Sequence, residues 1–309
     1  MRASGTLVAL AFASTLGLST PATAYICTRV QDESGHETGS SLSWFVRDLT
    51  YALDPAGTAD IAGTNEFAVM SASFVVWQNL TDAGEGPSCA SWPDEVDLTF
   101  TEVPKEPART TIGYDYLHPS ENENLLIFYD TGWPHADLGS GIIALTTTTY
   151  NAQTGEIIDA DIELNSERFR FTVGDTSVST DLENTTVHEI GHVLGLGHTS
   201  VTAATMYAGA ELGETSKRTL ACDDRDGIAF KYPAGAANGY CSPAVASCGY
   251  CAPAGTPTSD VDITVEGKDS GLGGCGCRAS GAGSWALLGS LLAVGPWRTL
   301  RRRRRSRRH

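Results

Sequence analysis

The central part of this chain has few basic residues. Residues 25–278 contain only 12 lysine and arginine residues but all 37 aspartate and glutamate residues, which gives a net charge of −25. The other basic residues are Arg2 and eight arginines at the C-terminus. Such a surface repels nucleic acid and favours cations or basic substrates. Methionine and histidine are also scarce, with three and seven residues, and no internal repeat is evident.

The N-terminus has the features of a secretory signal. Arg2 is followed by an uncharged stretch at residues 5–18 and by Ala22-Thr23-Ala24, a cleavage-site pattern of small residues. We therefore expect residues 1–24 to be removed during secretion, with Tyr25 as the first residue of the mature protein.

The C-terminus has the features of a second targeting element, at residues 273–309. Gly273-Gly274-Cys275-Gly276-Cys277 leads into 19 uncharged residues at 279–297, and an arginine block follows at 301–305. Such a segment is just long enough to cross a bilayer, and the arginines would stay cytoplasmic. The arrangement resembles the C-terminal sorting signals of bacterial surface proteins, in particular the MYXO-CTERM type. A plain membrane anchor is the alternative, and the secretory signal disfavours a nucleic-acid-binding tail. We expect attachment to the membrane or cell envelope, or release from the cell after processing.

One run of residues carries the candidate chemistry, and it reads His188-Glu189-Ile190-Gly191-His192-Val193-Leu194-Gly195-Leu196-Gly197-His198. On a helix, His188 and His192 leave the same face one turn apart, which suits two ligands of one zinc ion. Gly195 tolerates the left-handed backbone that ends a helix, so the chain can return His198 to the same ion. Three protein ligands leave a fourth position for water, as in catalytic sites. Glu189 could take a proton from that water.

This motif resembles that of the metzincin metalloproteases. In metzincins a methionine-containing turn lies under the zinc, and Thr205-Met206-Tyr207 stands at a fitting distance after His198. A buried methionine in a loop is the alternative interpretation of Met206. Further segments resemble the matrixin branch, the family of the matrix metalloproteases; they are Trp44, Leu49-Thr50-Tyr51 and residues 72–77, 98–103 and 223–228.

The resemblance covers roughly residues 44–233 and implies an α+β fold of the metzincin, or zincin-like, type. Such a fold has a twisted, mostly parallel five-stranded sheet, long helices and an active-site cleft. We expect the segments of the chain to be an N-terminal segment at 25–43, the catalytic domain at 44–235, a stalk rich in Cys, Gly and Pro at 236–272, and the sorting signal at 273–309.

Hydrophobic patterning places the elements of this domain. It predicts strands at 41–54, 96–103, 125–129, 142–150 and 156–164, and helices at 65–80 and 223–231. Asp181 or Thr180 should cap the helix of the zinc motif, which should run to about Leu194. The resemblance makes residues 142–150 our candidate for the edge strand along which an extended substrate lies, with an ordinary strand as the alternative. Residues 206–221 should form the wall of the pocket beside the zinc.

A second metal site is where the sequence departs from the resemblance. Animal matrixins hold a structural zinc with additional histidines near the edge strand, whereas residues 155–163 contain no histidine. We therefore predict no structural zinc; the remaining histidines, which do not fall at the expected spacing, are His36, His118, His135 and His309. Ca²⁺ could bind through oxygen ligands, and the candidates are Asp137, Asp161 and Glu163. A solvated acidic turn explains these carboxylates equally well.

Six cysteines lie outside the predicted sorting signal, and their even number fits disulfides in an oxidising compartment. We interpret Cys248-Gly249-Tyr250-Cys251 as disulfide-forming rather than as a zinc knuckle. Many matrixins are held inactive by a propeptide thiolate on the zinc, but Cys27 lacks the Pro-Arg-Cys-Gly context of that switch. We therefore favour a disulfide between Cys27 and Cys89, because the other four cysteines cluster at residues 222–251.

Together these features predict a secreted or surface-anchored zinc endopeptidase that hydrolyses extracellular proteins or peptides. One Zn²⁺ on His188, His192 and His198 would activate water and polarise the scissile carbonyl, with Glu189 as the general base. Two alternatives remain open: a surface adhesin or binding module on the same scaffold, and a zinc hydrolase that does not act on peptides.

Overall fold

The computed structural model describes residues 25–32, 36–80, 96–105, 112–241, 251–253, 275–280 and 285–292. The predicted signal peptide at residues 1–24, Cys89 and most of the predicted stalk lie outside these residues.

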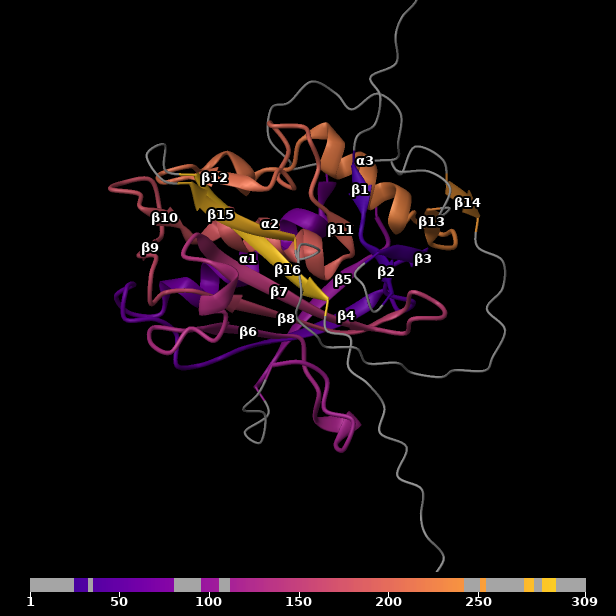
Figure 1. Ribbon diagram of the computed structural model, residues 1–309, viewed down its shortest axis with the longest axis horizontal. Coiled ribbons are helices and arrows are strands. Elements are labelled where there is room, and N and C mark those ends of the chain that lie inside the picture. Colours follow the sequence, from indigo (N-terminus) through magenta and orange to yellow (C-terminus); the bar gives the residue numbers. More distant parts are fainter. Residues whose placement is uncertain are drawn as a thin grey trace, which may run out of the picture.

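Five strands form the centre of the molecule, and they come from the five segments predicted to be strands (Figure 1). Their order in the sheet is β7-β8-β6-β4-β5. β4 pairs in parallel with β5 and β6, β6 pairs in parallel with β8, and β7 pairs with β8 antiparallel. This confirms the expected mostly parallel sheet. The bounds are β4 Asp48–Leu53, β5 Thr99–Val103, β6 Leu125–Phe128, β7 Ile142–Tyr150 and β8 Ile157–Leu164.

Two helices, α1 and α2, pack against each other on one side of this sheet (Figure 1). Helix α1 spans Asn65–Gln78 and buries Met70, Phe74 and Trp77, which recur at helical spacing. The indole Nε1–H of Trp77 donates to the carbonyl oxygen of Val187 in α2 at 2.8 Å. Helix α2 spans Leu182–Val193 and carries His188, Glu189 and His192 of the zinc motif, and α3 spans Cys222–Lys231.

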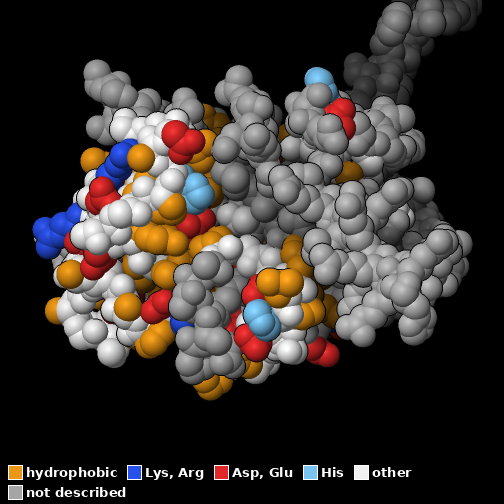
Figure 2. Space-filling view, turned by 60° about the horizontal axis from the view of Figure 1, so that its bottom comes forward, with side chains coloured by type: hydrophobic (Ala, Val, Ile, Leu, Met, Phe, Trp, Pro, Cys, Tyr) orange, Lys and Arg blue, Asp and Glu red, His pale blue; other side chains and the backbone are white. Residues whose placement is uncertain are grey.

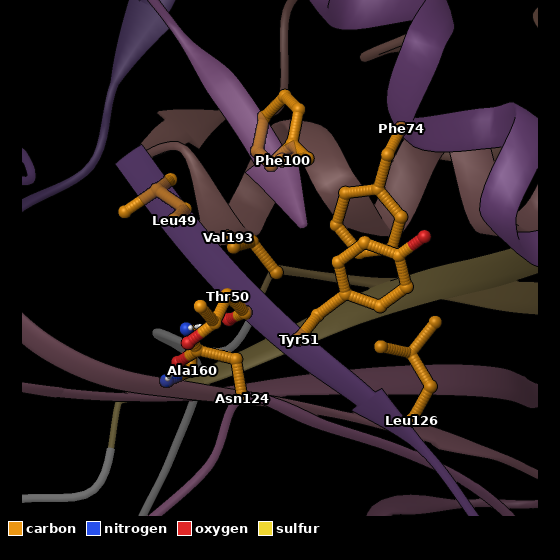
Figure 3. Close-up of a pocket in the computed structure, with 9 residues that line it drawn as sticks. All are labelled: Leu49, Thr50, Tyr51, Phe74, Phe100, Asn124, Leu126, Ala160 and Val193. Atoms are coloured by element: carbon orange, nitrogen blue, oxygen red, sulfur yellow. Dashed lines mark hydrogen bonds between the residues drawn. The ribbon is translucent and has the colours of Figure 1, made fainter. Parts of the chain in front are cut away.

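The hydrophobic core lies between the sheet and these helices. The rings of Tyr51 in β4 and Phe74 in α1 stack with their centroids 3.8 Å apart. A small apolar pocket beside them is lined by residues of β4, β5, β6, β8 and the two helices (Figure 3). Its only titratable side chain is Tyr51, so we assign this pocket to the core rather than to the chemistry; the lining residues are Leu49, Thr50, Tyr51, Phe74, Phe100, Asn124, Leu126, Ala160 and Val193.

The strand predicted at residues 41–54 is divided in the structure. β3 spans Glu37–Ser41 and pairs with β2 at Arg29–Gln31, whereas β4 begins only at Asp48. Between them, Ser43 exchanges backbone hydrogen bonds with Gly155 and Ile157, both 2.9 Å long. The prediction of one continuous strand was wrong. Residues 42–46 lie between β3 and β4 and contact other parts of the domain instead of continuing either strand.

The remaining elements are short. β1 (Ile26–Cys27) pairs with β11 (Leu196–Gly197), β9 (Phe171–Thr172) with β10 (Thr180–Asp181), and β13 (Gly239–Cys241) with β14 (Cys251–Pro253). Single turns of 3₁₀ helix are η2 (Pro119–Glu121), η3 (Ala136–Leu138) and η4 (Ser216–Arg218).

Strand β7 is not at the edge of the sheet in this structure. β16 (Trp285–Leu292) pairs with it in parallel from Ile142 to Thr148, and β15 (Cys275–Ser280) and β12 (Gly209–Glu211) pair with β16. The prediction that residues 142–150 form a free edge is therefore corrected. An edge strand has unpaired N–H and C=O groups, and here a strand of the same chain pairs with them.

The C-terminal apolar segment is extended where the structure describes it, at residues 279–280 and 285–292. Within the described residues, no helix is both long and apolar enough to span a bilayer. The sorting role of residues 273–309 stays a prediction. On the described part of the face shown in Figure 2, acidic side chains are spread among apolar ones, with few basic side chains, as the net charge of residues 25–278 leads one to expect.

Candidate metal centre

Helix α2 begins where the sequence predicts. Asp181 is its N-cap, and its Oδ1 accepts the backbone N–H of Asn184 at 2.8 Å. Arg218 contacts the same carboxylate at 2.8 Å through Nε and at 2.5 Å through Nη2. The hydrogen bond to Asp181 raises the pKa of the Arg218 guanidinium. The start of the helix is thereby joined to η4, which follows it by more than twenty residues.

Gly195 ends the helix in the left-handed conformation that the motif predicts. Its φ is +79°, and its N–H donates to the carbonyl oxygen of His192 at 2.8 Å. A Cβ atom at this position would lie 2.3 Å from the carbonyl oxygen of Leu42. Both the backbone angle and the close approach require glycine, and His198 can follow only because the helix stops here.

Side chains from distant elements bind the last carbonyl groups of α2, which helices leave without internal partners. Trp44 donates its Nε1–H to Val193 O at 2.9 Å, and the Tyr232 hydroxyl donates to Leu194 O at 3.0 Å. The same Tyr232 hydroxyl accepts the backbone N–H of Trp44 at 3.1 Å. Sequence reasoning placed Trp44 in a strand and missed these contacts, because no local pattern marks them.

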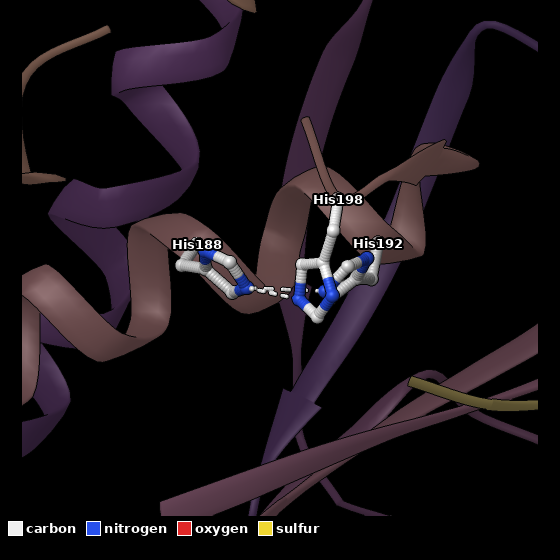
Figure 4. Close-up of side chains that lie close together, drawn as sticks. All are labelled: His188, His192 and His198. Atoms are coloured by element: carbon white, nitrogen blue, oxygen red, sulfur yellow. Dashed lines mark hydrogen bonds between the residues drawn. The ribbon is translucent and has the colours of Figure 1, made fainter. Parts of the chain in front are cut away.

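The three histidines of the motif converge (Figure 4). The Nε2 atom of His188 lies 3.1 Å from Nε2 of His192 and 3.2 Å from Nε2 of His198. Among the described residues, these three form the one group of three or more His, Cys, Asp or Glu side chains close enough to share a metal ion. The structure thus brings together all three predicted ligands.

Backbone carbonyls orient the first two rings. His188 Nδ1 lies 2.5 Å from Thr205 O, and His192 Nδ1 lies 2.8 Å from Leu196 O. A carbonyl oxygen only accepts, so each Nδ1 carries the proton and each Nε2 presents a lone pair. Burial lowers the pKa of His188 well below its usual range and that of His192 to about 4. Both rings are therefore neutral at pH 7, the form that binds metals.

This arrangement fits a zinc ion. The Nε2 lone pairs of His188 and His192 face each other across 3.1 Å with no proton to share between them, and a cation placed there removes the repulsion. Zn–N bonds of about 2.0–2.1 Å in tetrahedral geometry separate two ligand nitrogens by roughly 3.3 Å. The observed separations of 3.1 and 3.2 Å are close to that value.

Glu189 directly follows His188 in α2 and is fully buried. Its Oε2 accepts a hydrogen bond of 2.6 Å from the Thr146 hydroxyl in β7. Thr146 was predicted only as part of a strand, so its contact with Glu189 is a feature that sequence reasoning missed.

Met206 packs directly against the zinc helix. A Cβ atom on Gly191 of α2 would lie 2.2 Å from the Met206 sulfur. The N–H of Thr199, which follows the third histidine, donates to Met206 O at 3.0 Å. Met206 thus contacts α2 and the segment that carries His198, and its role as a methionine turn under a zinc ion stays a prediction.

The carboxylate of Asp224 in α3 holds the Met206 turn. It accepts the N–H groups of Thr205 at 2.7 Å, Met206 at 2.9 Å and Ala221 at 2.9 Å. Burial raises the pKa of Asp224 to about 6. The aspartate pattern of residues 223–228 predicted a helix start, but nothing in it predicted which aspartate would reach the turn.

Lys217 stabilises the segment predicted to form the pocket wall, residues 206–221. Its buried ammonium donates to Gly209 O at 2.7 Å and to Tyr207 O. Its backbone N–H donates to the side chain of Asn184 in α2 at 2.8 Å. The segment that follows the Met206 turn is thereby fixed against α2, the helix that carries His188 and His192.

The structure does not gather the three carboxylates proposed for calcium. Asp161 accepts the N–H groups of Leu125 at 2.8 Å and Gly113 at 2.6 Å, and Glu163 contacts His135 at 2.8 Å. Asp137 is exposed. Within the part of the chain that is described, they form no cluster of three potential ligands. Asp161 and Glu163 instead join neighbouring segments through these contacts.

Cys27 and Cys222 are each disulfide-bonded. A thiolate switch needs a free thiol, so the bonded state of Cys27 disfavours that alternative. Cys89 lies outside the described residues, and its pairing with Cys27 stays a prediction.

Comparison with known proteins agrees with this geometry. The chain is 29% identical over 200 residues to Metalloendoproteinase 2-MMP of Arabidopsis thaliana, covering 64% of this chain and 44% of the relative. It is 39% identical over 141 residues to Neutrophil collagenase of Homo sapiens, covering 46% of this chain and 26% of the relative. The chain therefore spans less than half the length of these relatives. The Matrixin family model, Peptidase_M10, matches residues 43–233, which is more than half of the chain, and the protein belongs to the matrixin family.

Proposed function

We propose that this matrixin is a zinc-dependent endopeptidase that hydrolyses peptide bonds of extracellular proteins. The observation that carries the proposal is the convergence of three histidine Nε2 atoms while two of the rings are committed to carbonyl oxygens through Nδ1. Such a set offers three ligands and leaves a further coordination position for water. The names of the relatives, a metalloendoproteinase and a collagenase, agree with it.

The residues of the chain have distinct roles in this proposal. His188, His192 and His198 hold the ion, which when bound lowers the pKa of water and polarises the scissile carbonyl. Glu189 takes a proton from the attacking water onto its carboxylate and then passes it to the leaving amine. The burial of Glu189 strengthens its electrostatic interactions with neighbouring groups.

We further propose that the protein is secreted through residues 1–24 and retained at the cell envelope through residues 273–309. The supporting observations are the uncharged stretches at both ends, the small residues at 22–24 and the arginine block at 301–305. The C-terminal pattern resembles that of the bacterial MYXO-CTERM signals.

Hydrolysis of casein by the purified protein tests the endopeptidase. We expect a chelator to abolish hydrolysis and added Zn²⁺ to restore it. An adhesin on the same scaffold would bind surfaces but leave casein intact under every metal condition, and that result would contradict the proposal.

A further inference from the structure

A side chain of the central sheet reaches the carboxylate proposed as the general base. The Thr146 hydroxyl lies 2.6 Å from Glu189 Oε2 and 3.3 Å from the backbone oxygen of Glu189. Both residues have no exposed surface. A hydroxyl has a single proton, so the shorter distance and the negative charge assign it to Oε2.

This hydrogen bond makes the two carboxylate oxygens different. A glutamate side chain has three rotatable bonds, and its carboxylate oxygens exchange by a simple rotation. With Oε2 held by Thr146, rotation breaks a charge-assisted hydrogen bond in a buried site, where such bonds are strong. The branched Cβ of threonine restricts its own χ1, so the donor itself is held in place.

The register of β7 fixes where this donor stands. Thr146 pairs with Ile162 of β8, and the pairing continues from Ala144 to Tyr150. A shift by one residue would turn Thr146 to the opposite face of the sheet, away from α2. The pairing of β7 with β8 therefore sets the position of the Thr146 hydroxyl independently of α2.

We propose that Thr146 is a positioning residue for Glu189, which holds the carboxylate in one orientation for proton transfer. This inference rests on the proposed function, because it assumes that Glu189 acts as the base. The hydroxyl of Thr146 keeps its proton throughout. Its contribution is to hold Oε2, so that the proton of the attacking water is accepted without prior rotation of the carboxylate.

The test compares Thr146→Val, which removes the hydroxyl but keeps the shape, with Thr146→Ser, which keeps the hydroxyl. Zinc content, Tm, kcat and KM for a peptide substrate are measured on the full chain. We expect Thr146→Val to lower kcat about tenfold, because the loss of one hydrogen bond to a charged group changes a rate by about that factor. KM and bound zinc should stay at wild-type values, and Thr146→Ser should recover most of kcat.

Thr186→Val is the matched control. Thr186 is a fully buried threonine of α2 whose hydroxyl has no hydrogen-bond partner in the described part of the chain. The control makes the same substitution at a buried threonine three residues before Glu189. We expect kcat of this variant to remain unchanged. If Thr146→Val does not fold, Thr146→Ala removes the same hydroxyl and is compared with Thr146→Ser in its place.

Three results would overturn the inference. Wild-type kcat in the folded Thr146→Val variant would show that the hydroxyl does not position the base. Equal losses in the valine and serine variants, in step with Tm, would show a structural role only. An inactive zinc-loaded wild type would reject both the endopeptidase and this inference. An active wild type with an equally active Thr146→Val variant would reject this inference alone.

Discussion

At the scale of single residues, backbone carbonyls orient the neutral rings of His188 and His192, and the Thr146 hydroxyl holds the Glu189 carboxylate. The spacing of His188, His192 and His198 was sufficient to predict that they meet, because helical geometry fixes the first two and Gly195 returns the third. The partners of these side chains could not be predicted. Thr146 is 43 residues from Glu189 along the chain, and contacts of that kind depend on the packed fold.

Replacing Glu189 tests its role as the base. Glu189→Gln keeps the size of the side chain and all three histidines, so bound zinc should persist. Hydrolysis should fall by roughly 10²-fold or more, the contribution of a positioned general base. Metal analysis and peptide hydrolysis on the same preparation check this, and near-normal activity would remove Glu189 from the mechanism.

The buried histidines should make the zinc-free protein sensitive to acid. In the unfolded chain histidine titrates near 6.5, whereas burial lowers the pKa of His192 to about 4 and lowers that of His188 as well. Between these values the unfolded state binds more protons, so stability is present above pH 6.5 and is lost as the pH falls towards 4. Urea unfolding of the zinc-free protein across this range should show the loss.

His192→Gln is the comparison for that experiment. It removes one of the two depressed pKa values, so its free energy of unfolding should fall less steeply with decreasing pH than that of the wild type. Parallel slopes for the two proteins would show that His192 is not buried in its neutral form.

At the scale of elements, the start and end of α2 were predicted within one residue, and β7 was predicted with the bounds that the structure shows. Both segments have strong local signals, a capping aspartate and glycine in one and a β-branched run in the other. The break between β3 and β4 and the pairing of β16 with β7 had no such signal. They depend on which backbone groups elsewhere in the fold are available for hydrogen bonding.

The end of α2 should not tolerate a side chain on Gly195. Gly195→Ala places a Cβ atom on a residue with a left-handed backbone, which destabilises the fold by about 1 kcal/mol. The same Cβ atom would lie 2.3 Å from Leu42 O. We expect a lower Tm and weaker zinc binding, since His198 follows this turn. Gly174→Ala is the matched control, because Gly174 has a φ of +80° and nothing within 4 Å of the added atom. Equal losses of Tm in the two variants would show that the contact with Leu42 is unimportant.

At the scale of the whole molecule, the two ends of the chain differ from the acidic domain between them. The net charge of −25 over residues 25–278 and the arginine-rich tail were evident from the sequence. The pairing of part of the C-terminal segment with β7 was not evident from the sequence. An apolar run of this length is compatible with a membrane helix, a buried helix or a strand.

Deleting residues 273–309 should change both the location and the sheet edge of the protein. We expect the truncated protein to be released from the cell and to remain active, because every proposed catalytic residue precedes residue 207. Loss of β16 also exposes the N–H and C=O groups of β7, so KM for extended peptides should not rise. Retention in the envelope fraction would reject the sorting role, and a released but inactive protein would reject the domain boundary.

Titration of the metal-free protein with Zn²⁺ shows directly whether one zinc ion on His188, His192 and His198 is responsible for the activity. Peptide hydrolysis and bound zinc are followed together for the wild type and for His198→Ala. We expect wild-type activity to rise with added zinc and to level off at one equivalent, while His198→Ala binds zinc more weakly and stays inactive at that concentration. Hydrolysis by the metal-free wild type, or full activity of His198→Ala at one equivalent, would contradict a single catalytic zinc held by the three histidines.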